Sequence, residues 1–229
     1  MNIYNAHWID LTHSLSSDIP QWNIDCGFKK FITLDYAACD AEVKFQVNKL
    51  NMVAGIGTHI DAPAHCIKGA KTIDQISLNQ LIARCYLIDV SNKSHEAYKI
   101  SVNDIFDFEL NYERIQKCSI VLFYTGWSQF WENNAQYRNN LIFPSVSIEA
   151  AQLLLERNVH GLGIDTLSPD CGDSGFPVHQ LFLKNDKIII ENIANARQLP
   201  AVGSVLFALP MKIKDGTEAP LRLIAKLDV

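Results

Sequence analysis

Short apolar runs with polar or glycine residues at both ends recur along the chain, and they constrain its fold more than any other feature. Runs of this length with such boundaries are typical of β-strands buried in a core. An alternation of apolar and polar residues is typical of a strand with one buried face. We expect strands in HWIDLTHSL (7–15), CYLIDV (85–90), CSIVLFYTGW (118–127), GLGIDTL (161–167), KIIIENI (187–193) and twice within residues 204–229.

Helical patterns lie between these runs. The clearest is SIEAAQLLLERN (147–158), which begins with Ser147 as an N-cap and places alanine and leucine side chains on one stripe. Residues 101–115 and 72–81 are less regular helical candidates. Strands outnumber helices, and the two do not alternate as they do in a doubly wound sheet. No repeat or linker divides the chain, so we predict a single mixed α/β domain over residues 1–229 with a mixed β-sheet core.

The charge and the cysteines exclude several classes of protein. The formal net charge is −5, which leaves no basic footprint for nucleic acid or for an anionic membrane surface. No apolar stretch reaches the roughly 18 residues of a membrane span, and the amino terminus does not resemble a signal peptide. We therefore expect a cytoplasmic protein. The cysteines contain no CxxC pair, as expected for reduced thiols: Cys26, Cys39, Cys66, Cys85, Cys118 and Cys171.

The stretch GTHIDAPAH (57–65) places His59, Asp61 and His65 within seven residues. Imidazole and carboxylate groups are the usual ligands of zinc, manganese and iron. In an extended segment, residues two apart point the same way, so His59 and Asp61 can face one cavity, while Pro63 ends the strand before His65. The alternative interpretation is a chance cluster of ordinary loop residues, and spacing alone does not decide between the two.

Two residues far along the chain are candidate partners for this stretch. His179 lies in a loop marked by glycine and proline, and Glu191 follows three consecutive isoleucines. A buried carboxylate is costly unless it is paired or bound to a cation, so Glu191 is a candidate metal ligand. The alternative is that its strand lies at a sheet edge and that Glu191 faces water.

Four blocks of sequence resemble the metal-dependent cyclase family, which includes bacterial kynurenine formamidase and isatin hydrolase. The blocks are GTHIDAPAH, FYTGW (123–127), GIDTLSPD (163–170) and the pair His179 and Glu191, twelve residues apart. The opening IDLTHSLSSDIPQW (9–22) and the closing GTEAPLRLIA (216–225) are also similar to that family, so the resemblance covers nearly the whole chain.

The resemblance implies a fold, an assembly and roles for particular residues. The fold is a swivelling β/β/α domain, and the assembly is a homodimer or homotetramer with active sites near the subunit contacts. His59, Asp61, His179 and Glu191 correspond to the metal ligands, with Asp61 able to bridge two ions. His65 corresponds to the proton donor and acceptor, and Trp22 to a residue that contacts aromatic substrate; Trp127 and Phe176 are further candidates for an aromatic wall.

Gly55 is the departure from the family pattern. Formamidase members read HxGTHxDAPxH, and their first histidine is a ligand of one of two metals, whereas this chain has a glycine there. A site without one of about four ligands binds metal weakly or not at all. We therefore predict one tightly bound divalent ion per subunit, zinc or manganese, with a second weak or absent. Asn51 or Cys66 could replace the ligand, although each also fits an ordinary role as a turn residue or a small buried side chain.

The predicted activity follows from this set of residues. A metal-bound hydroxide would attack an amide, formamide or lactam carbonyl of a small aromatic substrate, and His65 would pass the proton to the leaving nitrogen. The resemblance makes a kynurenine formamidase-like hydrolase of carbon–nitrogen bonds the first hypothesis. The second is a catalytically degenerate member that binds a small molecule without turnover because one metal site is lost. Retention of the other family residues favours the enzyme.

Overall fold

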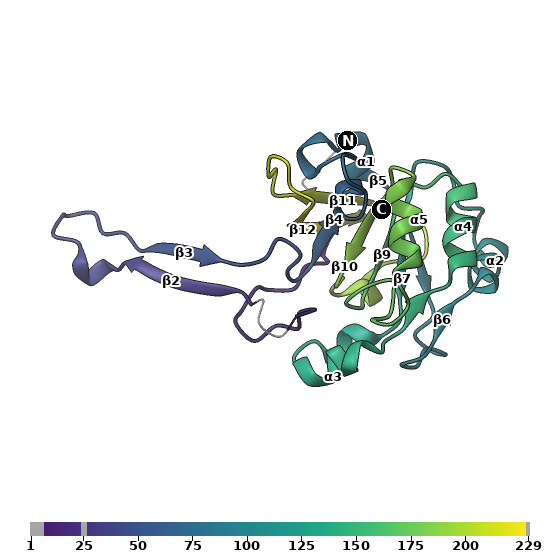
Figure 1. Cartoon of the computed structure of the whole chain (residues 1–229), viewed down its shortest axis with the longest axis horizontal. Helices are drawn as coiled ribbons and strands as arrows, with labels where there is room; N and C mark the ends of the chain where they lie inside the picture. The colour runs from purple at the N-terminus through teal and green to yellow at the C-terminus, as the bar shows by residue number, and fades with distance from the viewer. Residues whose placement is uncertain (1–6, 24–26, 228–229) are drawn as a thin grey trace.

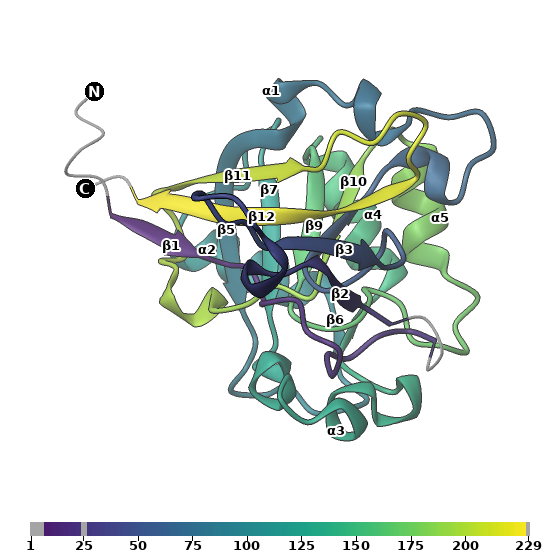
Figure 2. The same ribbon diagram turned by 90° about the vertical axis from the view of Figure 1, so that its left-hand side faces the viewer.

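The computed structural model describes residues 7–23 and 27–227, and its centre is a closed β-barrel (Figures 1 and 2). The order around the barrel is β12, β11, β5, β7, β9, β10 and β4, and β4 pairs with β12 again to close it. Four of these strands, β5, β7, β9 and β10, are parallel, and the other pairings are antiparallel. The barrel strands are β4 (His59–Asp61), β5 (Ile82–Asp89), β7 (Ile120–Tyr124), β9 (Gly161–Ile164), β10 (Ile188–Glu191), β11 (Ser204–Pro210) and β12 (Glu218–Leu227).

Each predicted strand segment overlaps a strand of the structure, although β5 begins at Ile82, before the predicted segment 85–90. The segment 7–15 contains β1 (Trp8–Asp10), which extends the sheet beside the carboxyl-terminal half of β12. The predicted mixed α/β architecture with a mixed β core is thereby confirmed. What the sequence did not indicate is the closure of the sheet, because closure depends on the pairing of the three-residue β4 with two distant strands.

Two apolar cores lie on the two faces of the parallel strands. Cys85 and Leu87 of β5 point into the barrel, while Tyr86 and Ile88 point outward against the helices. β7 and β10 show the same alternation. Because both faces of these strands are buried, their sequences read as continuous apolar runs.

Helices cover the outer face of the parallel strands, as Figure 1 shows for α2 (Val102–Asn111), α4 (Ile148–Glu156) and α5 (Pro177–Lys184). The prediction for 147–158 is confirmed, because the Ser147 side chain caps α4 by accepting from the amide of Ala150 at 3.1 Å. The helix predicted over 101–115 ends at Asn111. The helix predicted over 72–81 is wrong for most of its length, where a 3₁₀ turn (Ile73–Gln75) precedes the short α1 (Leu78–Leu81). α3 (Asn134–Arg138) and α5 were not predicted.

A β-hairpin projects from the barrel and was not predicted. It consists of β2 (Lys29–Leu34) and β3 (Val47–Asn51), and Figure 1 shows it extending away from the rest of the molecule. A separate short pair, β6 (Lys99–Ile100) with β8 (Ser145–Val146), lies between helical segments. The hairpin differs from the barrel strands in exposing most of its apolar side chains.

The described cysteines are free thiols, as predicted: Cys39, Cys66, Cys85, Cys118 and Cys171. Cys26 lies outside the described residues. Within the described part of the chain, no helix has the combination of length and hydropathy that crossing a bilayer requires.

Candidate metal centre and active site

Strand register brings three of the predicted residues together. β10 pairs with β4 so that Glu191 lies opposite His59 and Ile190 lies opposite Ile60. Residues opposite each other on neighbouring strands share one face of the sheet. Ile60 and Ile190 belong to the barrel core, so the two-residue period of a strand turns His59, Asp61 and Glu191 outward.

Gly57 shapes the start of this strand. Its φ is +60°, which favours glycine, and a Cβ there would lie 2.5 Å from Leu15 Cδ2, so a larger residue would also displace the Leu15 side chain. The Gly57 carbonyl oxygen lies 2.9 Å from His59 Nδ1 and accepts its proton. The same oxygen accepts from the Asn192 side-chain amide at 2.9 Å. These contacts fix the imidazole so that Nε2 of His59 faces the site.

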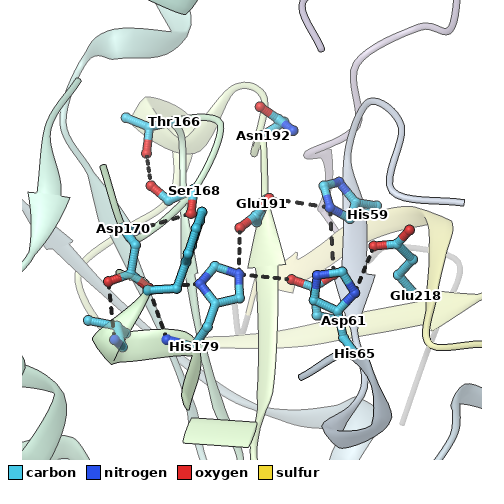
Figure 3. Close-up of polar contacts among 12 residues, drawn as sticks. His59, Asp61, His65, Thr166, Ser168, Asp170, His179, Glu191, Asn192 and Glu218 are labelled. Carbon is cyan, nitrogen blue, oxygen red and sulfur yellow. Dashed lines mark hydrogen bonds and ion pairs between the residues drawn. The ribbon is translucent and has the colours of Figure 1, made fainter. Parts of the chain in front are cut away.

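His179 reaches the same place from the first turn of α5. The Asp170 carboxylate accepts from the backbone amides of Val178 and His179 at 3.1 and 2.9 Å, and lies 2.7 Å from His179 Nδ1. One carboxylate therefore satisfies amides at the start of the helix and orients the imidazole, as Figure 3 shows. Nε2 of His179 is left facing Asp61 and Glu191.

The four predicted metal ligands form a ring in which imidazoles and carboxylates alternate (Figure 3). His59 Nε2 lies 3.7 Å from Asp61 Oδ1 and 3.3 Å from Glu191 Oε2. His179 Nε2 lies 3.5 Å from Asp61 Oδ2 and 3.3 Å from Glu191 Oε1. Two ligands of one tetrahedral ion are about 3.3–3.6 Å apart, so each histidine–carboxylate pair has about the spacing of ligands that share an ion, although each carboxylate turns a different oxygen to each histidine.

The ring is buried, and its charges shift each other's protonation. Burial lowers the pKa of His59, but Glu191 and Asp61 outweigh this effect and raise it to about 9. Burial likewise opposes the charged form of His179, whereas Asp170, Asp61 and Glu191 raise its pKa to about 12. Burial favours protonated Asp61, yet the neighbouring histidines hold its pKa below the usual range. The ring therefore strongly favours positive charge at its centre.

Carboxylate oxygens without a hydrogen-bond partner indicate that the positive charge at the centre of the ring can be that of a metal ion. Both carboxylate oxygens of Asp61 and Oε1 of Glu191 are buried without a hydrogen-bond partner among the described residues. Buried polar atoms are normally hydrogen-bonded or bound to an ion. Two imidazole nitrogens and two carboxylates are also a donor set that zinc and manganese accept. The residues present therefore fit a divalent metal.

The ring lies at the wall of a cavity of about 590 Å³. His65, on the 3₁₀ turn Pro63–His65, lines this cavity together with the ring residues. Its side chain is 34% exposed, and its Nδ1 lies 3.0 Å from Glu218 Oε2. Its ring centre is 6.1 Å from that of His179. The structure thus places His65 beside the candidate metal ligands with its other ring nitrogen free of that contact.

Aromatic side chains form part of the cavity wall. Trp22 and Phe176 line it, with their ring centres 5.6 Å apart. Trp127 does not line the cavity, because it is buried in the apolar cluster against which Trp22 packs, and its indole nitrogen donates to the Tyr137 carbonyl at 2.8 Å. The candidate wall therefore includes two of the three aromatic residues suggested by the sequence.

Of the two suggested substitutes for a ligand at Gly55, only one lies near the cavity. Asn51 is exposed at the end of β3, in the projecting hairpin. Cys66 lines the cavity. Among the described residues, however, the side-chain groups close enough to share a metal are Asp61 with His65 and His179, and His59 with Asp61 and Glu218. Neither group contains Cys66, and neither contains Glu191, although Glu191 lies 3.3 Å from both His59 and His179.

Sequence reasoning missed two acidic residues. Asp170 lies within the GIDTLSPD block but had no assigned role. Glu218, the first residue of β12 and part of the turn-rich segment 214–220, lies opposite Asp61 because β12 pairs with β4. The sequence pattern that could have identified Glu218 as a site residue is an acid at the start of an apolar strand, but many surface turns have the same pattern. Only the pairing of β12 with β4 reveals its place.

Comparison with known proteins agrees with this geometry. The family model Cyclase matches residues 9–171. The isatin hydrolase of Roseibium aggregatum is 29% identical over 184 residues, which cover 74% of this chain and 70% of that protein. The kynurenine formamidase of Bacillus thuringiensis subsp. konkukian is 25% identical over 222 residues, which cover 96% and 98%.

Solved structures give the same result. A crystal structure of an isatin hydrolase bound to the product analogue thioisatinate has a TM-score of 0.91 at 25% identity, over 99% of this chain and 94% of that one. A structure titled as a predicted metal-dependent hydrolase from Bacillus stearothermophilus has a TM-score of 0.76 at 26% identity, over 96% and 98%. The match of the family model over most of the chain shows that the protein belongs to the cyclase family and is homologous to isatin hydrolase and kynurenine formamidase.

Proposed function

We propose that the protein is a metal-dependent hydrolase that cleaves an amide, formamide or lactam carbon–nitrogen bond in a small aromatic substrate. The observation that supports this most directly is the buried ring of His59, Asp61, His179 and Glu191 beside a cavity walled in part by Trp22 and Phe176. The homologues named isatin hydrolase and kynurenine formamidase make such substrates the first to test.

The residues of this chain divide the chemistry between them. Some set of the four ring residues holds a divalent ion, zinc or manganese, which lowers the pKa of water and polarises a carbonyl when bound. Glu218 accepts the proton of His65 Nδ1, so Nε2 of His65 is available to take a proton and return it to the leaving nitrogen. Trp22 and Phe176 offer an apolar surface to an aromatic ring. Most of the exposed area of the cavity wall is apolar, although many polar side chains also line it.

The projecting hairpin supports a homo-oligomer. A two-stranded sheet alone is at best marginally stable in water. This one exposes about half of each of several apolar side chains, namely Phe31, Ile32, Tyr36, Phe45, Val47 and Leu50. We propose that a second copy of the chain covers them, in a homodimer or homotetramer, as the family resemblance implies. The swivelling β/β/α class and the cytoplasmic location also stay predictions, the latter supported by the free thiols.

A reconstitution screen tests the activity. The metal-stripped protein is loaded separately with zinc, manganese or iron and assayed against N-formyl aromatic amines, isatin-like lactams and simple esters. We expect turnover of at least one carbon–nitrogen substrate that depends on added metal. Metal binding without turnover of any compound would favour the alternative of a catalytically degenerate binding protein.

A further inference from the structure

The space beside Gly55 is filled by the carboxylate of Glu218. A Cβ built on Gly55 would lie 2.8 Å from Oε2 and 3.0 Å from Cδ of Glu218. A side chain at position 55 and the present position of the carboxylate therefore exclude each other. The backbone at Gly55 is not left-handed, unlike that at Gly57. Glycine is thus needed at position 55 for the space that it leaves to Glu218.

The position of Glu218 is fixed by the barrel closure. As the first residue of β12, it lies opposite Asp61 of β4. The following residue, Ala219, belongs to the barrel core, so the alternation along β12 turns Glu218 to the outward face that also carries His59 and Asp61. The carboxylate thus enters the site from the strand on the opposite side of β4 from Glu191.

A second observation points to an ion between these groups. His59, Asp61 and Glu218 each offer a ligand atom, and these atoms all lie within 4.8 Å of one another. Asp61 turns Oδ1 toward His59 and Oδ2 toward His179, and both oxygens are buried without a hydrogen-bond partner among the described residues. Asp61 can therefore serve two ions at once, one through each oxygen.

We propose that Glu218 supplies the ligand missing at Gly55 and, with His59 and Asp61, binds a second divalent ion beside the one contacted by His179 and Glu191. The inference rests on the proposed function, since it assumes a metal at the first position. It replaces the expectation of a weak or absent second ion, because the lost imidazole is exchanged for a carboxylate from another strand. Manganese and magnesium accept a carboxylate as an additional ligand more readily than an imidazole. We therefore expect the second position to bind manganese more tightly than zinc.

The simpler role of Glu218 is to orient His65, whose Nδ1 lies 3.0 Å from Oε2. That role predicts an effect on turnover alone. A ligand role also predicts a change in the number of bound ions. The two roles are therefore separated by metal stoichiometry, which does not depend on turnover.

The experiment measures manganese bound to the full chain after dialysis, by mass spectrometry and titration calorimetry. The variant Glu218→Gln keeps the shape and removes the charge, and Glu113→Gln, at an exposed ion pair with Arg84, is the matched control. We expect two ions for the wild type and the control, and one for Glu218→Gln. Electron paramagnetic resonance should show a spin-coupled pair in the wild type and an isolated manganese in Glu218→Gln.

A rescue variant guards against a folding artefact. In the double variant Gly55→His with Glu218→Gly, an imidazole at position 55 takes the space that the Glu218 carboxylate occupies in the wild type. We expect this variant to bind two ions again. Equal stoichiometry and affinity in the wild type and Glu218→Gln would overturn the role of Glu218 while leaving the proposed function standing. Absence of any bound metal in the wild type would instead overturn the proposed function itself.

Discussion

Glu191 on β10 lies directly opposite His59 on β4, and Glu191 Oε2 is 3.3 Å from His59 Nε2. The two residues are 132 positions apart in the chain, yet the register makes them neighbours on one face. Their contact links the GTHIDAPAH stretch to the second half of the candidate site, and it is the basis of the predictions below.

Asp61→Asn should abolish tight metal binding. The substitution keeps the shape of the side chain but removes the charge that faces both His59 and His179. The loss of affinity should exceed the roughly 10–100-fold that follows removal of a residue that only orients a ligand. Dialysed protein analysed for metal by mass spectrometry checks this, with the exposed Asp186→Asn as control. Wild-type metal content in Asp61→Asn would remove Asp61 from the ligand set.

Asp170→Asn should weaken metal binding without abolishing it. Asp170 orients His179 through Nδ1 and also accepts two amides at the start of α5. We expect roughly 10–100-fold lower metal affinity and a loss of about 1 kcal/mol in the free energy of unfolding. Titration calorimetry and chemical denaturation measure the two effects. A loss of stability with unchanged affinity would limit Asp170 to a role in the helix.

His65→Gln should reduce turnover and retain metal. Loss of a proton-transferring group typically costs roughly 10²–10⁴-fold in rate. Because His65 is partly exposed and outside the four-residue ring, the ion at the first position should stay bound, and its loss would instead place His65 with Asp61 and His179 in the ligand set. Turnover and metal content measured on the same preparation test this, and an unchanged rate would show that another group moves the proton.

Metal binding should release protons and strengthen as pH rises. In the metal-free protein the pKa of His59 is raised from 6.5 to about 9 and that of His179 to about 12, so both are protonated at neutral pH. Metal ligands must be deprotonated, so each of the two histidines that ligates should release about one proton, whether the two bind one ion or two. Calorimetry in buffers of different ionisation enthalpy counts these protons, and a count of zero would contradict the raised pKa values.

The raised histidine pKa values also predict how the stability of the metal-free protein changes with pH. A raised histidine pKa stabilises the metal-free fold fully below pH 6.5, and the part due to His59 is lost as pH rises toward about 9. The gap in melting temperature between metal-loaded and metal-free protein should therefore widen across this range. Thermal unfolding with manganese or with a chelator at several pH values measures it, and a narrowing gap would contradict the argument.

Polar substitutions in the hairpin should break the oligomer. Phe31→Ser, Ile32→Ser and Phe45→Ser together remove apolar side chains that are about half exposed in the single chain. We expect the mass measured by light scattering to fall to that of the monomer. Phe106→Ser, on the exposed side of α2, is the control and should leave the mass unchanged. A triple variant with the mass of the wild type would show that another surface joins the copies.

Local sequence patterns predicted every barrel strand except β4, and they singled out His59, Asp61, His179 and Glu191 as candidate ligands. The runs around Leu87, Leu122 and Ile189 are buried on both faces, so their composition alone identifies them as core strands. The spacing of His59 and Asp61 follows the two-residue period of a strand. A carboxylate after three isoleucines identified Glu191, because burial of a charge requires a partner. These are local patterns that a linear sequence retains.

The closure of the barrel and the place of Glu218 depend on contacts between segments that are distant in the chain. The three residues of β4 pair with β10 on one side and β12 on the other, and no local pattern specifies such pairing. This pairing places Glu218 opposite Asp61, with its carboxylate in the space that Gly55 leaves empty. Position 55 carries no side chain where the family pattern has a histidine. The register of β4 and β12, which is set by contacts between distant segments, brings the Glu218 carboxylate into that space.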